Sequence, residues 1–420
     1  MPKSFSDSRL DYRPLVNLCL RVVTMACRFL LVFALAKLLN LSELGLFGLV
    51  SATIIFSQLV IGGEFYTYSQ RELITQGISR RSFVLQHQGI TLLCIYILIA
   101  PMLLGVFFFD LLPMQMIGWF YFLLISESIA QELNRVLIAL QCQIMASVVL
   151  FVRHGLWVIL VLPLMWFEAD LRSLSVIFFA WSISVVVAVL IGVFLVKEQT
   201  NDWKIWPLDL SWIKKGLRIS FLYFLGALCF RSFFTLDRYV VENLMGIEFL
   251  GIYTVFVGLA MTIVTVLDPL IFSFLYPKLV AFVRDKDFLN FKAKMALLFW
   301  STLLVALVGV AVVVFVSPFI FDWIDKPEFS GNLPVLWILL VAAFFYGVSM
   351  VPHFGLYALN DDRSLFKTHL ISLGLFLTCL YLFPSFVPLK QVVGSSLITG
   401  FLAMALLKGW FYNQHKTELV

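Results

Sequence analysis

Six arginines fall inside stretches that are otherwise apolar enough to cross a membrane: Arg21, Arg28, Arg135, Arg153, Arg218 and Arg231. A charged side chain at the centre of a membrane helix costs about 2.5–3.5 kcal/mol on insertion scales, so it normally faces protein or water. Arginine also binds phosphate oxygens in a bidentate geometry that strengthens where water is scarce. These residues therefore predict a membrane-depth site for an anion, and pyrophosphate is an apt ligand.

The arginines are spaced in a way that gathers them on helix faces. Arg21 and Arg28 are seven residues apart, and so are Arg231 and Arg238. Seven residues advance a helix by about 10.5 Å and nearly two turns, so both members of a pair share one face. We predict that these four line a central cleft as a ladder of positive charge, and that Arg218 joins them near the cytoplasmic end.

Each of these positions also has a structural interpretation. Arg218 could extend its long side chain to the lipid headgroups. Arg238 could be a loop residue beside Asp237. Arg28 is too deep for either, and its alternative role is a buried ion pair that fixes helix packing.

A polar stripe runs along the stretch "ISESIAQELNRVLIAL". Its members share one helical face, because they stand at i, i+4, i+7 and i+8: Glu127, Gln131, Asn134 and Arg135. Glu132 is expected to point elsewhere. Glu127 either pairs with Arg28 or binds a coupling proton, and both roles stay open.

Other polar residues are harder to assign from their positions. Arg135 and Arg153, with His154 beside it, fit ordinary positions near the cytoplasmic ends of their spans. Asp268 precedes Pro269 deep in an apolar run, and proline kinks a helix and frees backbone carbonyls. This pair predicts either an ionisable bending point that couples to an ion, or a purely structural kink.

The composition places the chain in a membrane. Of its 420 residues 61% are hydrophobic and 13% are charged, against roughly 25% charged in an ordinary soluble domain. Apolar runs long enough to cross a hydrocarbon core of about 30 Å recur along the whole length. The prediction is an all-α polytopic protein of about twelve spans, near 14–38, 44–66, 84–109, 115–139, 145–167, 172–196, 213–236, 249–275, 293–321, 333–358, 366–384 and 388–411. The N-terminus lacks the pattern of a cleaved signal peptide, so the first span should be retained.

The basic residues predict the orientation. With the N-terminus in the cytoplasm, 19 of the 30 Lys and Arg fall on cytoplasmic segments, among them Lys3, Arg9 and Lys408. Five fall on the opposite side: Lys37, Arg172, Arg238, Lys326 and Lys390. Because positive charge is retained inside during insertion, both termini are predicted to be cytoplasmic. The net charge of +5 is an orientation signal and gives no reason to expect nucleic acid as a partner.

The chain divides into two halves at its most polar interior segment. We predict an N-terminal lobe over 1–199 with six spans, an interfacial linker over 200–212, and a C-terminal lobe over 213–420 with six more. The segments "LGLFGL" (44–49) and "LGIYTV" (250–255) occupy equivalent positions in the two halves. An even number of spans per copy implies parallel repeats about an axis along the membrane normal.

Several classes of function have little support. Six cysteines and five histidines are scattered singly, without the spacing of a metal site or a disulfide framework, and no cofactor or catalytic residue is indicated. Outer loops such as "DLLPMQM" and "FEADLRS" are short. A membrane glycan polymerase or acyltransferase would need catalytic side chains there, so an enzyme is the last choice.

The organisation resembles a known family. Twelve spans in two lobes, "LSELGLFGL" after the first span and "LDRYVVENLMGIEFLGIYTV" (236–255) are similar to polysaccharide repeat-unit flippases of the Wzx type. These belong to the multidrug/oligosaccharidyl-lipid/polysaccharide (MOP) exporter superfamily. The most telling part is the D-R-Y segment (237–239) followed by G-I-Y (251–253).

The resemblance implies a flippase of the bacterial inner membrane. Its substrate would be an undecaprenyl-pyrophosphate-linked oligosaccharide for O-antigen or capsule, moved by alternating access through a cationic lumen. It also implies membrane lipids as surroundings and leaves room for a polysaccharide polymerase or chain-length complex as a partner. A drug or metabolite exporter of the same superfamily would share the fold, but an organic-cation pump should present carboxylates more than arginines.

Overall fold

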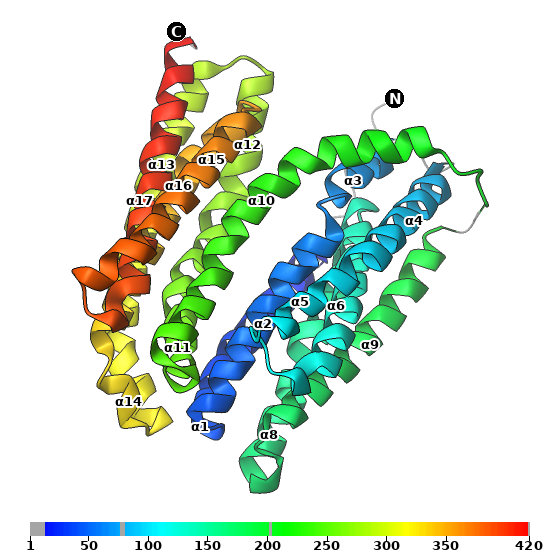
Figure 1. Cartoon of the computed structure of the whole chain (residues 1–420). Helices are drawn as coiled ribbons and strands as arrows, with labels where there is room; N and C mark the ends of the chain where they lie inside the picture. Colours follow the sequence, from blue (N-terminus) through cyan, green and yellow to red (C-terminus); the bar gives the residue numbers. More distant parts are fainter. Residues whose placement is uncertain (1–12, 76–79, 201–203, 419–420) are drawn as a thin grey trace, which may run out of the picture.

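The computed structural model describes residues 13–75, 80–200 and 204–418, and they are helical almost throughout (Figure 1). The described part contains no strand, so the predicted all-α class is confirmed. Eleven of its helical segments are long and apolar enough to span a membrane. The remaining predicted span corresponds to α6 (Ile117–Ala139), whose polar stripe lowers its hydropathy. Lys3 and Arg9, used above for the orientation, and positions 201–203 of the predicted linker lie outside the described residues.

Figure 1 shows two helical bundles. The first bundle contains α1 (Arg13–Leu38), α2 (Leu41–Gly62), α3 (Tyr66–Thr75), α4 (Arg81–Ile99), η2 (Ala100–Leu104), α5 (Gly105–Phe108), η3 (Met114–Met116), α6, α7 (Gln143–Phe151), η4 (Val152–Leu156), α8 (Trp157–Phe167), η5 (Ala169–Leu171) and α9 (Leu174–Glu198). The second bundle contains α10 (Leu210–Met245), α11 (Ile247–Leu267), η6 (Asp268–Phe272), α12 (Ser273–Arg284), α13 (Phe288–Ile324), α14 (Pro327–Ser330), α15 (Leu333–Ala358), α16 (Asp362–Leu382), η7 (Phe383–Ser385) and α17 (Leu389–Glu418).

The long helices run between two ends of the molecule. The near end carries α3 and the last turns of α12 and α17, and the far end carries α14 and the last turns of α1 and α8 (Figure 1). The bundles meet at the far end, where α2 packs on α11 and α1 packs on both α11 and α13.

Glycines let the bundles touch backbone to backbone at the far end. A Cβ atom added at Gly45 would overlap the carbonyl oxygen of Ile247, and one added at Gly251 would overlap that of Leu41. Gly45 and Gly251 are 206 residues apart, and so are Leu41 and Ile247. Contacts between equivalent positions arise where a twofold axis passes between two copies, so these pairs support the predicted parallel repeat.

Polar contacts reinforce the same interface. Ser42 donates to Glu248 across 3.4 Å, again with an offset of 206 residues. The hydroxyls of Thr53 on α2 and Tyr239 on α10 lie 2.6 Å apart. Each hydrogen bond of this kind contributes about 1 kcal/mol. The far end is therefore held by close packing together with matched polar groups.

Two lysines also join the bundles at this end. Lys326, just before α14, donates to the carbonyls of Ala36 and Leu39 at the C-terminus of α1. A cation there donates to free carbonyls and interacts favourably with the negative end of the helix dipole. Lys37 donates to the carbonyl of Trp323 and lies over its ring, with Nζ 4.7 Å from the centroid. Trp323 stacks in turn on Trp166 of the first bundle.

The helix α10 connects the two bundles. It begins over the near end of the first bundle and ends beside α11 (Figure 1). Its first turns pack on the first bundle: Trp212 lies against Phe65 and Tyr68, and Gly216 leaves room for both rings. The segment before it is fixed by Gln86 of α4, whose side-chain amide donates to and accepts from the backbone of Trp206.

Asp209 caps the start of α10. Its carboxylate accepts from the backbone N–H of Trp212 at 3.0 Å, as an N-cap residue does. Hydrogen bonds from the Ser211 hydroxyl and from Trp212 hold the pKa of Asp209 below its ordinary value. This cap fixes the residue at which α10 begins.

Candidate functional site

A cavity of about 750 Å³ lies between the bundles. Its first-bundle wall comes from α1, α2 and the turn after it, α4, α6, α7, η4, α8 and α9, and its second-bundle wall comes from α10 and α11. Five arginines and three glutamates line it, which leaves an excess of two positive charges: Arg28, Arg135, Arg153, Arg231, Arg238, Glu64, Glu127 and Glu132. A membrane-depth cavity with this balance favours an anionic ligand over a cationic one.

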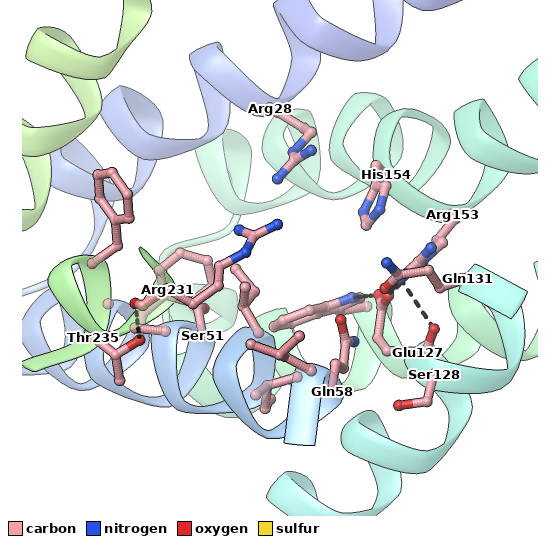
Figure 2. Close-up of a pocket in the computed structure, with 18 of the residues that line it drawn as sticks. Arg28, Ser51, Gln58, Glu127, Ser128, Gln131, Arg153, His154, Arg231 and Thr235 are labelled. Atoms are coloured by element: carbon pink, nitrogen blue, oxygen red, sulfur yellow. Dashed lines mark hydrogen bonds and ion pairs between the residues drawn. The ribbon is translucent and has the colours of Figure 1, made fainter. Parts of the chain in front are cut away.

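Arg28 and Arg231 are the arginines of this lining that have no ion-pair partner among the described residues. Arg28 projects from α1 and Arg231 from α10, and in Figure 2 their side chains extend toward the same space. Both are exposed to the cavity. Within the described residues, neither guanidinium has a hydrogen-bond or ion-pair partner. An unpaired charge at this depth is costly, and it is stabilised by water in the cavity or by an anion.

Glu127 forms an ion pair with Arg153. Its carboxylate also accepts from the indole Nε1 of Trp181 at 2.5 Å. Arg153 also donates to the Glu127 carbonyl at 3.1 Å, and both side chains are buried. Pairing with Arg28 was one of two roles left open for Glu127, and the structure gives the ion pair to Arg153 instead. Figure 2 shows this group on the opposite side of the cavity from Arg231.

Arg153 had been placed at the end of a span from sequence, and the structure corrects this. It lies in η4, a π-helical turn within the predicted fifth span. A π-helical turn rotates the following residues relative to a regular helix and often occurs at functional sites. Here it turns Arg153 toward Glu127 and leaves the neighbouring His154 in the cavity lining.

A second charged group lines the cavity closer to the near end. Arg135 pairs with Glu132 at 2.5 Å, and Glu132 accepts from Gln88 at 2.9 Å. The guanidinium of Arg135 lies 3.5 Å from the centroid of the Tyr66 ring, a cation–π contact. Glu132 was expected to point away from the polar stripe of α6, and Arg135 to be a boundary residue. The expectation for Glu132 was wrong, because Glu132 lines the cavity. Arg135 lies near the end of α6 and also lines the cavity as a member of the stripe.

The stripe itself lies where its spacing predicts. All four members line the cavity: Glu127, Gln131, Asn134 and Arg135. Asn134 donates to the carbonyl of Ala146 at 2.6 Å, which joins α6 to α7. The amides of Gln131 and, from α2, Gln58 add hydrogen-bonding groups to the wall (Figure 2).

Arg238 lines the cavity but is not free. It belongs to α10, which extends nine residues past the predicted end of that span, so the loop interpretation was wrong. Its guanidinium donates to the carbonyl of Phe234 and lies 3.2 Å from the carboxylate of Asp237. Asp237 is buried and accepts from the hydroxyl of Tyr253 at 2.9 Å. The D-R-Y and G-I-Y segments therefore hold α10 to α11.

Three further predicted residues lie outside the cavity lining. Arg21 donates to the hydroxyl of Ser147 at 3.2 Å, on the face of α1 that packs on α7. Arg218 is exposed in the near-end part of α10. Asp268 is exposed at the start of the π-helical η6, so the predicted kink takes the form of a π-helical turn that contains Pro269. Of the predicted ladder, three arginines line the cavity: Arg28, Arg231 and Arg238. Arg238 has partners in Phe234 and Asp237.

Comparison with solved structures identifies the fold. No protein-family model and no curated protein matches the chain. An inward-facing multidrug resistance MATE transporter of the MOP superfamily superposes with a TM-score of 0.77 at 15% identity, over 95% of this chain and 98% of that one. An outward-facing structure of a multidrug resistance MATE transporter gives 0.59 at 13% identity, over 98% and 95%.

A third similar structure bears on the cavity. It is a MOP-superfamily transporter from Pyrococcus furiosus, with a TM-score of 0.61 at 14% identity over 98% of this chain and 95% of that one. That protein is described as having a binding pocket of reverse polarity that suggests a different function. The chain thus has the fold of MATE-type transporters, and its cavity has to be interpreted from its own residues.

Proposed function

We propose that the protein is a flippase for lipid-linked oligosaccharides that works by alternating access. Arg28 and Arg231 bind the pyrophosphate group that joins the oligosaccharide to undecaprenol. The near end faces the bacterial cytoplasm, so the arrangement described here receives substrate from inside. Rocking of the two bundles about the cavity then exposes the substrate to the outer leaflet of the inner membrane.

The pair of free guanidiniums carries this proposal. They come from opposite bundles, share one cavity and have no partner among the described residues (Figure 2). Pyrophosphate offers several oxygens to two forked donors at once, and each charge-assisted bond is roughly twice as strong as a neutral one. Because each bundle supplies one arginine, a bound anion also neutralises the repulsion between them.

The rest of the lining suits the sugar portion. Gln58 and Gln131 supply amide donors and acceptors, and Trp157 and Trp181 supply indole rings. Trp157 is 6% exposed and its Nε1 has no partner among the described residues, so it is a spare donor in the wall. Amides and indoles of this kind match the alternating hydroxyls and apolar faces of a sugar ring.

A multidrug exporter is the second candidate, because MATE transporters share this fold. An organic cation would need a free carboxylate. Two of the three cavity glutamates, Glu127 and Glu132, are ion-paired with arginines, and Glu64 is the remaining one. The Arg28 and Arg231 charges would repel such a substrate.

Surface glycan in a strain that lacks the protein tests the proposal. Arg28→Ala and Arg231→Ala should each abolish the glycan while the protein persists in the membrane, and Lys at either position should restore part of it. Arg284→Ala is the matched control, since the Arg284 side chain is 75% exposed and its ion pair is with its sequence neighbour Asp285. Normal glycan from both cavity variants would overturn the proposal. Altered drug tolerance with intact glycan in the deletion strain would establish the exporter instead.

A further inference from the structure

A second group of ionisable residues lies inside the second bundle, away from the cavity lining. Lys408 of α17 is 0% exposed, and in the described part of the chain its Nζ has no hydrogen-bond partner. Nδ1 of His353 on α15 and Nε2 of His369 on α16 are also buried without partners. Lys408 had been counted among cytoplasmic basic residues, and its position in the core corrects that expectation.

These three side chains form one cluster. The rings of His353 and His369 are stacked, with centroids 6.1 Å apart and an interplanar angle of 15°. Lys408 interacts electrostatically with both rings. Nδ1 of His369 lies 3.3 Å from the carbonyl oxygen of Gly226. That contact places a proton on Nδ1 and leaves the Nε2 lone pair as an open acceptor.

Among the residues that the structure describes, no acid forms an ion pair with the cluster. Of the carboxylates on neighbouring elements, Asp361 bonds to His415, Asp362 accepts from Tyr223, and Asp268 is exposed. Other ionisable side chains on the surrounding helices include Arg231, Asp237 and Glu242 of α10, Lys292 and Lys294 of α13, Tyr346 and Tyr357 of α15, Arg363 and Lys367 of α16, and Tyr412 and His415 of α17. Among the described residues, none of these has a hydrogen bond or ion pair with Lys408, His353 or His369.

We propose that Lys408, His353 and His369 form a proton-binding site, and that its occupancy changes the balance between the two arrangements of the bundles. A proton taken from water is held on the Lys408 amine, which then donates toward the open acceptors on the two histidines. Without the proton the three nitrogens are neutral and need no counter-ion, as in a core that lacks an acid. The buried, unpartnered Lys408 is the observation that motivates the site, since ionisable groups in membrane spans are normally functional.

The site has a mechanical connection to the cavity. The carbonyl of Gly226 accepts the hydrogen bond from His369, and Gly226 lies five residues before Arg231 on α10. The ring centroids of Phe230 and His369 are 5.4 Å apart. The Phe230 ring also contacts the Tyr346 ring, and Tyr346 interacts electrostatically with Arg231. A positive charge at Lys408 therefore acts on the turn of α10 that carries Arg231 and that links the two bundles.

The proposal rests on the alternating-access part of the proposed function and does not depend on the substrate, so its test needs none. Spin labels at Asp170→Cys and Glu328→Cys, both exposed at the far end, report the separation of the bundles in liposomes after the six native cysteines are replaced by alanine. Between about pH 5.5 and about pH 8.5, a range over which a buried lysine amine can gain or lose its proton, the ratio of the two arrangements should change about tenfold.

Lys408→Met should remove this pH dependence, and the variant Lys294→Met, at a partly exposed lysine, should keep it. His369→Gln retains a donor toward Gly226 but loses the ring acceptor, and it should weaken the dependence even if the Lys408 variant fails to fold. A pH-independent wild type, or a Lys408→Met protein with an unchanged response, would overturn the proposal. A response that disappears when chloride is replaced by gluconate would also overturn it and assign the cluster to a small anion.

Discussion

The cavity and the far-end interface treat charge in opposite ways. At the far end Lys326 and Lys37 satisfy carbonyls across the bundle boundary, and Tyr239 matches Thr53. In the cavity Arg28 and Arg231 face each other without partners among the described residues. Polar groups thus have hydrogen-bond partners where the bundles contact each other. The Arg28 and Arg231 guanidiniums have none among the described residues, at the place where a ligand would bind. This difference separates the surfaces that set conformation from the surface that binds.

The largest effect is expected where the interface has no spare room. Gly45→Ala places a methyl group against the backbone carbonyl of Ile247, which cannot move aside as a flexible side chain would. Overpacking of this kind costs about 1–3 kcal/mol, so the closed far end should lose about tenfold or more in population. The spin-label distance between positions 170 and 328 measures it.

The control for this variant is Gly89→Ala, because a Cβ at Gly89 meets nothing within 4 Å. A Gly45→Ala protein with the wild-type distance distribution would show that close packing does not close the far end.

The largest effect on stability, as distinct from the balance between the two arrangements, is expected in the buried ion pair of the cavity wall. Glu127→Gln leaves Arg153 with a 7% exposed side chain and no charged partner, at a cost of about 3–5 kcal/mol. We expect a clear fall in the midpoint of thermal unfolding followed by tryptophan fluorescence. Asp285→Asn removes the acid from an exposed pair and should leave the midpoint unchanged. Equal midpoints for both variants would mean that the Glu127 pair has no structural role.

A smaller effect is expected from the hydroxyl pair across the interface. Tyr239→Phe removes its contact with Thr53, worth about 0.5–1.5 kcal/mol, and should shift the bundle ratio a few-fold. Thr53→Val should do the same, and the double variant should be no worse than either single one. Additive effects in this cycle would show that the two hydroxyls do not act together.

The smallest effect is expected for Arg21. Its hydrogen bond to Ser147 is partly exposed and lies outside the cavity, so Arg21→Ala should leave ligand affinity within about twofold of wild type. A loss of ligand affinity as large as that caused by Arg28→Ala would show that Arg21 belongs to the binding site, as first predicted.

The fold was predictable because hydropathy depends on local composition. Spans, helix class and the repeat of "LGLFGL" and "LGIYTV" follow from segments that can be recognised one at a time. Helix ends were less predictable: α10 continues nine residues past its predicted end, where packing buries Asp237 and Val241, and α17 continues to Glu418. Lys408 was misplaced for this reason: from sequence it stands near the end of an apolar run, whereas α17 continues past it to Glu418.

The site was predictable only in part. The depth of Arg28 and Arg231 could be estimated along each helix, and both line the cavity. Pairing could not be estimated, because it depends on how neighbouring helices are rotated. The π-helical turn of η4 turns Arg153 onto Glu127, and periodicity within α6 alone gives no information about that turn.

Binding of undecaprenyl pyrophosphate to the purified protein tests the central claim most directly. Arg28→Ala and Arg231→Ala should each weaken binding by about 10²-fold, since each removes a charge-assisted contact worth about 2–5 kcal/mol, and Lys at either position should recover part of it. Arg284→Ala should bind like the wild type. Wild-type affinity in the Arg28→Ala, Arg231→Ala double variant would contradict the account.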